Sequence, residues 1–172
     1  MNINLLPENE YADFYKSYVS TVSDEYSLTE ELEISVHRLI KFVQDIPLDK
    51  YDYRYAEDKW TIKDIIQHLI DVERVFSYRA LRFSRNDNTQ LPGFDENTYA
   101  DNAFANNRSI KDLLTEIAIV RQSTLALFKT FKEEELLKMG KASGRDISVR
   151  AIGLIIIGHQ NHHLNIFKER YL

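Results

Sequence analysis

The stretch 148-SVRAIGLIIIGHQNHHLNIFKER-170 decides the fold class of this chain. Its isoleucine-rich half could form a buried β-strand, but the whole segment is too long for one strand. Ser148 is a typical helix N-cap, and Lys168 and Arg170 suit the negative C-terminal end of a helix dipole. No other segment alternates convincingly enough to be a partner strand, so we predict one long helix over residues 148–170.

Three earlier segments carry the same signals of long amphipathic helices. Each begins at a polar cap followed three residues later by an acidic residue, and continues with apolar residues at helical spacing. The predicted helices run from Ser27 to a stop before Pro47, from Thr61 to about Phe83, and from Ser109 to Phe128. Together with the last helix they predict an all-α four-helix bundle that forms a single domain over residues 1–172.

The segments between these helices are shorter or less regular. Apolar residues spaced between Pro7 and Val19 predict a short helix that packs as an N-terminal arm. Residues 86–107 show no sustained period, and a connection of this length is often functional in a compact domain. We expect short helical turns within it, a short turn over residues 133–139, and a loop bracketed by Gly140 and Gly144.

The composition excludes several classes of function. The 172 residues contain no cysteine, which excludes disulfides, zinc–cysteine fingers, iron–sulfur clusters and a cysteine nucleophile. The formal net charge is −5 and the basic residues are scattered, so we expect no nucleic-acid partner. The N-terminus lacks a secretory signal and no apolar run is long enough for a membrane span, so we expect a cytoplasmic protein without a membrane partner.

Three histidines predict a metal centre. His159 and His163 are four residues apart, which places both imidazoles on one face of the last helix, in line with its apolar stripe. His68 lies on or beside the apolar stripe of a second helix, and facing helices are how bundles build metal sites. Three ligands leave a fourth coordination position open for water or substrate. The alternative interpretation is three unrelated histidines satisfied by backbone groups or water.

Two further histidines and one carboxylate are weaker candidates. His162 lies about 100° around the helix from His163 and is expected at the surface or beside the ligands. His37 has no matching partner and is expected to be an ordinary surface or interface residue. Asp71, three residues after His68, is either a surface carboxylate or an acceptor that orients the His68 ring.

The long connection contains two candidate catalytic carboxylates, Asp95 and Glu96. They either form part of a solvated turn or supply a general base to a hydrolytic reaction. Arg79 and Arg150 could neutralise an anionic cosubstrate, although arginines near helix ends are usually surface residues.

These features resemble the DinB-like family of metal-binding four-helix bundles, which includes YfiT-like and bacillithiol transferase-like proteins. The resemblance spans nearly the whole chain. It rests on the helix start Trp60-Thr61 with His68 seven residues after Thr61, on the phrase DEN at 95–97, on SVR at 148–150 and on GHQNHH at 158–163. It implies an up-down-down-up bundle in which His68, His159 and His163 bind one divalent ion, usually zinc or nickel.

The resemblance also implies a metal-dependent enzyme acting on a small molecule. Relatives include thiol S-transferases that use low-molecular-weight thiols such as bacillithiol or mycothiol, and others are described as metal-dependent hydrolases. Three neutral imidazoles leave the ion dipositive and favour an anionic fourth ligand, which either a thiolate or a hydroxide would satisfy. The alternative is a non-catalytic bundle that binds metal or a small ligand in a stress-related or structural role.

The oligomeric state is a further prediction. The last helix is apolar on nearly all sides, and the chain contains ten Tyr and nine Phe, which could cover a two-fold interface. The family resemblance also favours dimers, although a buried monomer core explains the same residues. We therefore predict a homodimer.

Overall fold

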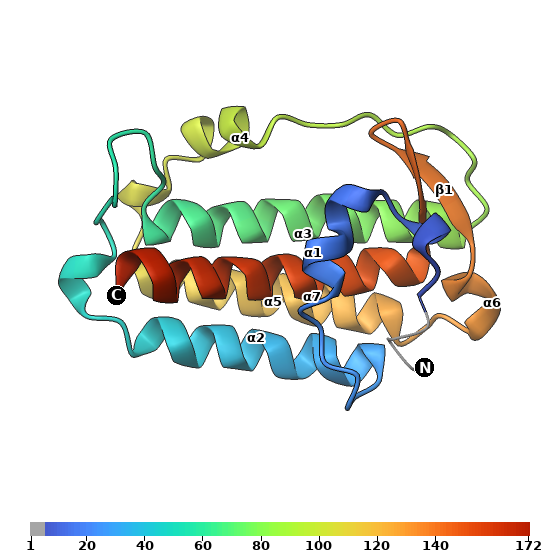
Figure 1. Cartoon of the computed structure of the whole chain (residues 1–172), viewed down its shortest axis with the longest axis horizontal. Helices are drawn as coiled ribbons and strands as arrows, with labels where there is room; N and C mark the ends of the chain where they lie inside the picture. The colour runs from blue at the N-terminus through green and yellow to red at the C-terminus, as the bar shows by residue number, and fades with distance from the viewer. Residues whose placement is uncertain (1–5) are drawn as a thin grey trace.

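Four long helices form the bundle that the sequence predicts. The computed structural model describes residues 6–172. The four helices are α2 (Leu28–Gln44), α3 (Ile62–Ser84), α5 (Ile110–Phe128) and α7 (Val149–Ile166). Helices α2 and α7 run in one direction and α3 and α5 in the other, so the order is up-down-down-up (Figure 1). Because α3 and α5 are parallel, the chain between them has to return along the length of the bundle.

The predicted helix starts are confirmed by their N-cap hydrogen bonds. At each start the cap side chain accepts from the backbone N–H three residues later, which satisfies one of the free donors of the first turn. The four caps are Ser27, Thr61, Ser109 and Ser148. The isoleucine-rich stretch is therefore helical, and α7 continues into a π-helical turn over Phe167–Tyr171.

The core consists of two apolar clusters, one in each half of the bundle. One cluster includes Phe76, Phe128 and Ile155, and the other includes Ile66 and Phe167. Most of α7 is buried against the other helices and the N-terminal arm. Its all-round apolar character is thus explained within one chain and no longer supports a two-fold interface. The homodimer itself stays a prediction.

The N-terminal arm, residues 6–26, crosses the outer side of α7 (Figure 1). The predicted single short helix is only partly right, because the arm consists of two 3-10 turns, Glu8–Glu10 and Asp13–Tyr15, and the short helix α1 (Lys16–Val19). Gly158 permits a close approach, since a Cβ atom there would lie 2.2 Å from the carbonyl oxygen of Tyr18. The arm is therefore held directly against the backbone of α7.

The connection between α3 and α5 contains the short helical turns that the sequence predicts. These are α4 (Glu96–Ala103), which lies over α3, and a 3-10 turn, Ala105–Asn107 (Figure 1). The turn predicted at residues 133–139 corresponds to α6 (Glu133–Leu136).

The loop predicted between Gly140 and Gly144 is wrong. Strands β1 (Met139–Ala142) and β2 (Arg145–Ser148) pair there as an antiparallel hairpin. The two turn residues, Ser143 and Gly144, have φ angles of 51° and 75°, the left-handed conformation that suits a two-residue hairpin turn. Strands of four residues are too short to show a clear alternation of apolar and polar residues, so only the Ser-Gly pair could have indicated the hairpin from the sequence.

Within residues 6–172, none of the helices is both long enough and apolar enough to cross a bilayer.

Candidate metal centre

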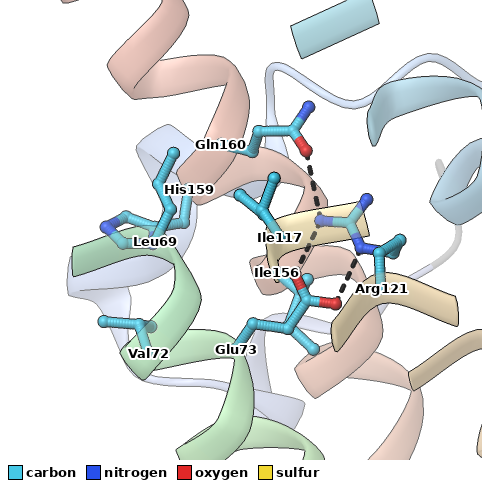
Figure 2. Close-up of a pocket in the computed structure, with 8 residues that line it drawn as sticks. All are labelled: Leu69, Val72, Glu73, Ile117, Arg121, Ile156, His159 and Gln160. Atoms are coloured by element: carbon cyan, nitrogen blue, oxygen red, sulfur yellow. Dashed lines mark hydrogen bonds and ion pairs between the residues drawn. The ribbon is translucent and has the colours of Figure 1, made fainter. Parts of the chain in front are cut away.

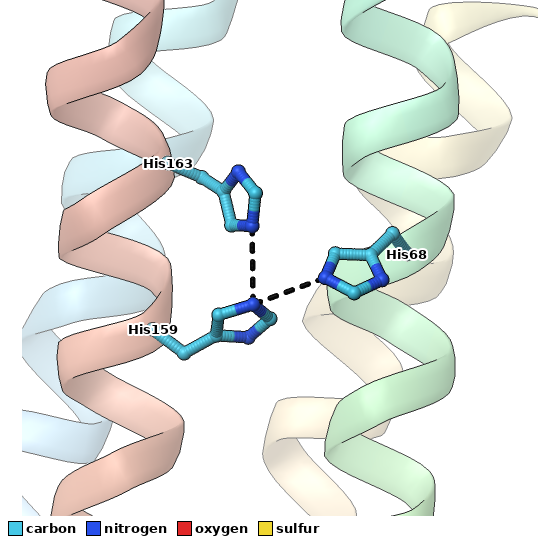
Figure 3. Close-up of side chains that lie close together, drawn as sticks. All are labelled: His68, His159 and His163. Atoms are coloured by element: carbon cyan, nitrogen blue, oxygen red, sulfur yellow. Dashed lines mark hydrogen bonds between the residues drawn. The ribbon is translucent and has the colours of Figure 1, made fainter. Parts of the chain in front are cut away.

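The three predicted histidines point toward one another across the α3–α7 interface (Figure 3). The Nε2 atom of His159 lies 3.0 Å from Nε2 of His68 and 3.0 Å from Nε2 of His163. Around a zinc ion with Zn–N distances of about 2.0–2.1 Å, tetrahedral geometry separates the nitrogens by about 3.3 Å. One ion would therefore fit between the rings after a small outward shift.

Hydrogen bonding alone satisfies this arrangement poorly. A neutral imidazole carries one N–H group and one lone pair, and only one of the two is at Nε2. Since the Nε2 atom of His159 faces two other Nε2 atoms, only one of these contacts can be a well-directed hydrogen bond. A divalent cation accepts all three lone pairs at once, and imidazole ligands suit transition-metal ions such as zinc, copper, iron and nickel.

Burial keeps the three imidazoles neutral. It lowers the pKa of His68 to about 4. Burial, together with the neighbouring imidazoles, lowers the pKa values of His159 and His163 well below the usual value. The lone pairs are consequently available at neutral pH, as metal binding requires. No carboxylate joins this group among the described residues, so an ion here would keep its dipositive charge.

Two aromatic rings pack against the histidines. Trp60, which precedes α3, lies against His68 with the ring centroids 4.8 Å apart. Tyr18 of the N-terminal arm lies 5.3 Å from His159 and 5.1 Å from His162. His162 is thus a neighbour of the arm, beside the three-histidine group. Tyr18 could not be assigned to the site from sequence, because only tertiary packing brings the arm to α7.

The two candidate carboxylates are both exposed, at the start of α4. Asp95 is the exposed N-cap of α4, and the hydrogen bond from the backbone N–H of Thr98 lowers its pKa. Glu96 begins α4, where partial desolvation and then the neighbouring Asp95 charge raise its pKa. Burial and then the negative charge of Glu96 raise the pKa of Tyr18.

A buried polar network lies beside His159 (Figure 2). The Nε and Nη2 atoms of Arg121 donate to the two carboxylate oxygens of Glu73 at 2.8 and 2.9 Å. Arg121 also donates to the side chain of Gln160 at 3.1 Å and to the carbonyl of Leu32 at 2.8 Å. A cavity of about 10 Å³ separates this network from His159, close to the volume that one water needs. The network joins all four long helices.

The sequence does contain a signal for this ion pair. Glu73 lies four residues after Leu69 and three before Phe76 on the buried stripe of α3. Arg121 lies four residues after Ile117 on the buried stripe of α5. Opposite charges at core positions of two helices indicate a buried ion pair. The pair was not predicted because the buried stripe of each helix was defined by its apolar residues alone, which leaves out Glu73 and Arg121.

The remaining charged candidates have structural partners. Asp71 accepts a hydrogen bond from the side chain of Gln67 at 3.0 Å, which accounts for it as a helix-surface acceptor. Arg79 donates to groups of the long connection and the hairpin turn. Arg150 forms an ion pair with Glu10 of the arm. The described contacts of the two arginines link separate segments of the fold.

Comparison with known proteins agrees with this architecture. The sequence profile of the DinB superfamily matches residues 31–167. YfiT from Bacillus subtilis, described as a probable metal-dependent hydrolase with an unusual four-helix bundle topology, superposes with a TM-score of 0.72 at 16% identity, over 83% of this chain and 82% of that one. YjoA, a DinB-like protein from Bacillus subtilis, gives a TM-score of 0.57 at 17% identity, over 82% and 86%. No curated protein matches at a significant level.

Proposed function

The chain belongs to the DinB superfamily, and from this premise we propose that it is a metal-dependent enzyme with a three-histidine centre. His68, His159 and His163 hold one divalent ion, zinc or nickel, and leave one coordination position for a small-molecule reactant. The convergence of three Nε2 atoms carries this proposal, with that of His159 lying 3.0 Å from each of the other two. YfiT, whose fold is shared, is described as a probable metal-dependent hydrolase, which supports the same class of chemistry.

The preferred reaction is thiol S-transfer. When bound, a divalent ion supported by neutral imidazoles lowers the pKa of a thiol or a water in the open position. The chain has no cysteine of its own, so the nucleophilic sulfur comes from a low-molecular-weight thiol cosubstrate. The three histidines set the direction of the open coordination position that the thiol occupies. Trp60 and Tyr18 restrict the access of bulk water from the sides they cover.

Hydrolysis is the second candidate, and the description of YfiT as a probable metal-dependent hydrolase favours it. A general base needs a pKa close to the working pH, and desolvation moves the pKa of Glu96 in that direction. In this version Glu96 takes the proton of the attacking water. Asp95 supports it as the cap of α4, which holds the first turn of the helix in place.

Metal content tests the centre directly. We expect tag-free protein to contain about one divalent ion per chain by mass spectrometry, and His68→Ala, His159→Ala and His163→Ala each to lose it. His162→Ala is the matched control, since it removes an adjacent imidazole and should keep the ion. Protein that stays metal-free after incubation with zinc or nickel would contradict the proposed metal-dependent enzyme and would favour the alternative, a non-catalytic binding bundle.

A thiol titration separates the two reactions. In cobalt-loaded protein, 2-mercaptoethanol should produce a sulfur-to-metal charge-transfer band if the open position takes a thiolate. Glu96→Gln should leave that band unchanged, but it should slow hydrolysis of ester probes by about 10²-fold or more if Glu96 is the base. A protein that binds the ion, gives no thiolate band and hydrolyses nothing would contradict both reactions.

A further inference from the structure

The small cavity between His159 and the buried ion pair has the size and the wall of a site for one water molecule (Figure 2). Its volume is about 10 Å³, close to what a single water needs. A water in such a space also needs polar partners. The wall offers four polar side chains, those of His159, Glu73, Arg121 and Gln160. The partners of a water here depend on which of these groups is still free to bond.

Arg121 has no hydrogen left for that water. Its Nε and Nη2 atoms donate to Glu73 at 2.8 and 2.9 Å, and Nη2 also donates to Gln160 at 3.1 Å. Its Nη1 atom donates to the carbonyl of Leu32 and to the hydroxyl of Ser35, both at 2.8 Å. These contacts use all five N–H groups of the guanidinium.

The carboxylate of Glu73 can still accept a hydrogen bond. An ionised carboxylate has about four lone-pair sites, and Arg121 occupies two of those on Glu73. Glu73 is therefore the anionic acceptor that the cavity wall offers to a water.

The contacts among the histidines fix which nitrogen of His159 carries its proton. Nδ1 of His163 is buried and has no hydrogen-bond partner among residues 6–172. A proton at that atom would be a buried donor without an acceptor, so His163 carries its proton at Nε2 and donates it to Nε2 of His159, 3.0 Å away. His159, when neutral, then carries its own proton at Nδ1, on the side of the ring turned away from the other two histidines (Figure 3).

The N–H group at Nδ1 of His159 needs an acceptor because the ring is buried. Nε2 of His159 is occupied by the histidine contacts, so Nδ1 is the nitrogen that remains for the cavity. We propose that one water in the cavity accepts from Nδ1 of His159 and donates to the carboxylate of Glu73. Glu73 is thus a positioning residue that acts on His159 through this water.

The consequence is a ring held in one orientation and one tautomer. With the proton kept at Nδ1, the lone pair of His159 Nε2 points to the candidate metal centre, and support of this kind commonly strengthens metal binding by histidine. The inference deepens the proposed function, on which the use of this lone pair rests. The water and the tautomer themselves need no metal ion, so they can be tested separately.

NMR of the metal-free protein tests the tautomer directly. Long-range ¹H–¹⁵N correlation at pH 7 shows which nitrogen of each imidazole carries the proton. We expect His159 in the Nδ1–H form, with a nuclear Overhauser effect between that proton and a water of long residence time. His159 in the Nε2–H form, or an Nδ1–H group without a bound water, would overturn the inference.

Filling the cavity tests the positioning role without removing the ion pair. Val72 lines the cavity, so Val72→Ile adds a methylene that should exclude the water. We expect the zinc affinity, measured by competition with a chelator, to fall about tenfold or more, and His159 to lose its single tautomer. Val75→Ile is the matched control, because the same change on the same helix lies outside the cavity wall and should leave both readouts unchanged.

The outcomes separate this inference from the proposed function. Unchanged zinc affinity and an unchanged tautomer in Val72→Ile would contradict the positioning role. Protein that shows the Nδ1–H form and the bound water but takes up no metal would contradict the proposed function alone. Protein that takes up metal, but whose metal-free form has the His159 proton at Nε2, would contradict this inference alone.

Discussion

At the scale of single residues, burial determines the charge state of the three histidines and the stability of the Arg121–Glu73 ion pair in the middle of the bundle. It keeps the three imidazoles neutral, and it makes the Arg121–Glu73 pair depend on mutual neutralisation. The side chains of Arg121 and Glu73 are 2% and 3% exposed, so neither charge can be solvated if its partner is removed.

We therefore expect Glu73→Ala to lower the free energy of unfolding by about 3–5 kcal/mol, since it leaves a buried guanidinium unpaired. Urea denaturation measures this change. Arg74→Ala is the matched control, because the Arg74–Glu116 pair is partly exposed and should contribute at most about 1 kcal/mol. Equal losses of unfolding free energy in the two variants would contradict a large contribution of the buried Arg121–Glu73 pair to the stability of the bundle.

At the scale of elements, glycine on α7 decides how closely the arm can approach. Replacing a helical glycine with alanine ordinarily stabilises a protein by about 1 kcal/mol. At Gly158 we expect the opposite sign, because the new Cβ atom would lie 2.2 Å from the carbonyl oxygen of Tyr18. Differential scanning calorimetry should show a lower melting temperature for Gly158→Ala, and limited proteolysis should cut residues 6–26 faster.

Asn165→Ala provides the comparison for this variant. Asn165 is exposed on the same helix, and alanine there should be neutral or slightly stabilising. If Gly158→Ala were as stable as Asn165→Ala, with an arm equally resistant to protease, the close packing of the arm on α7 would be refuted.

At the scale of the whole molecule, the buried histidines make the stability of the metal-free protein depend on pH. The pKa of His68 is about 4 in the folded chain against 6.5 in the absence of burial. As the pH falls below about 6.5, the unfolded chain binds a proton that the folded chain does not, so stability is lost between about pH 6.5 and 4. The loss assigned to His68 is about 3 kcal/mol at most.

Urea unfolding in the presence of a chelator, repeated from pH 7 to pH 4.5, measures this dependence. His68→Leu should flatten the curve relative to the unchanged chain, because leucine takes up no proton in either state. Parallel curves for the two proteins would mean that His68 is protonated equally in both states, in conflict with its buried environment.

The sequence by itself determined the four long helices, their caps and the three histidines that meet. Those features depend on local spacing: a cap such as Thr61 acts within its own first turn, and residues four apart, such as His159 and His163, share a face in any helix. The opposed charges of Glu73 and Arg121 also lie in phase with two apolar stripes, but the pair was not predicted because only the apolar members define those stripes. The hairpin was missed because its strands are only four residues long.

Only the tertiary structure decided what surrounds the three histidines. Tyr18 reaches His159 because the arm crosses α7 at a glycine, and the indole of Trp60 packs against His68. These contacts join segments far apart in the sequence, and they depend on how side chains fill space between helices. No periodicity of one segment encodes such packing, because each side chain's place is set by neighbours that the segment does not contain.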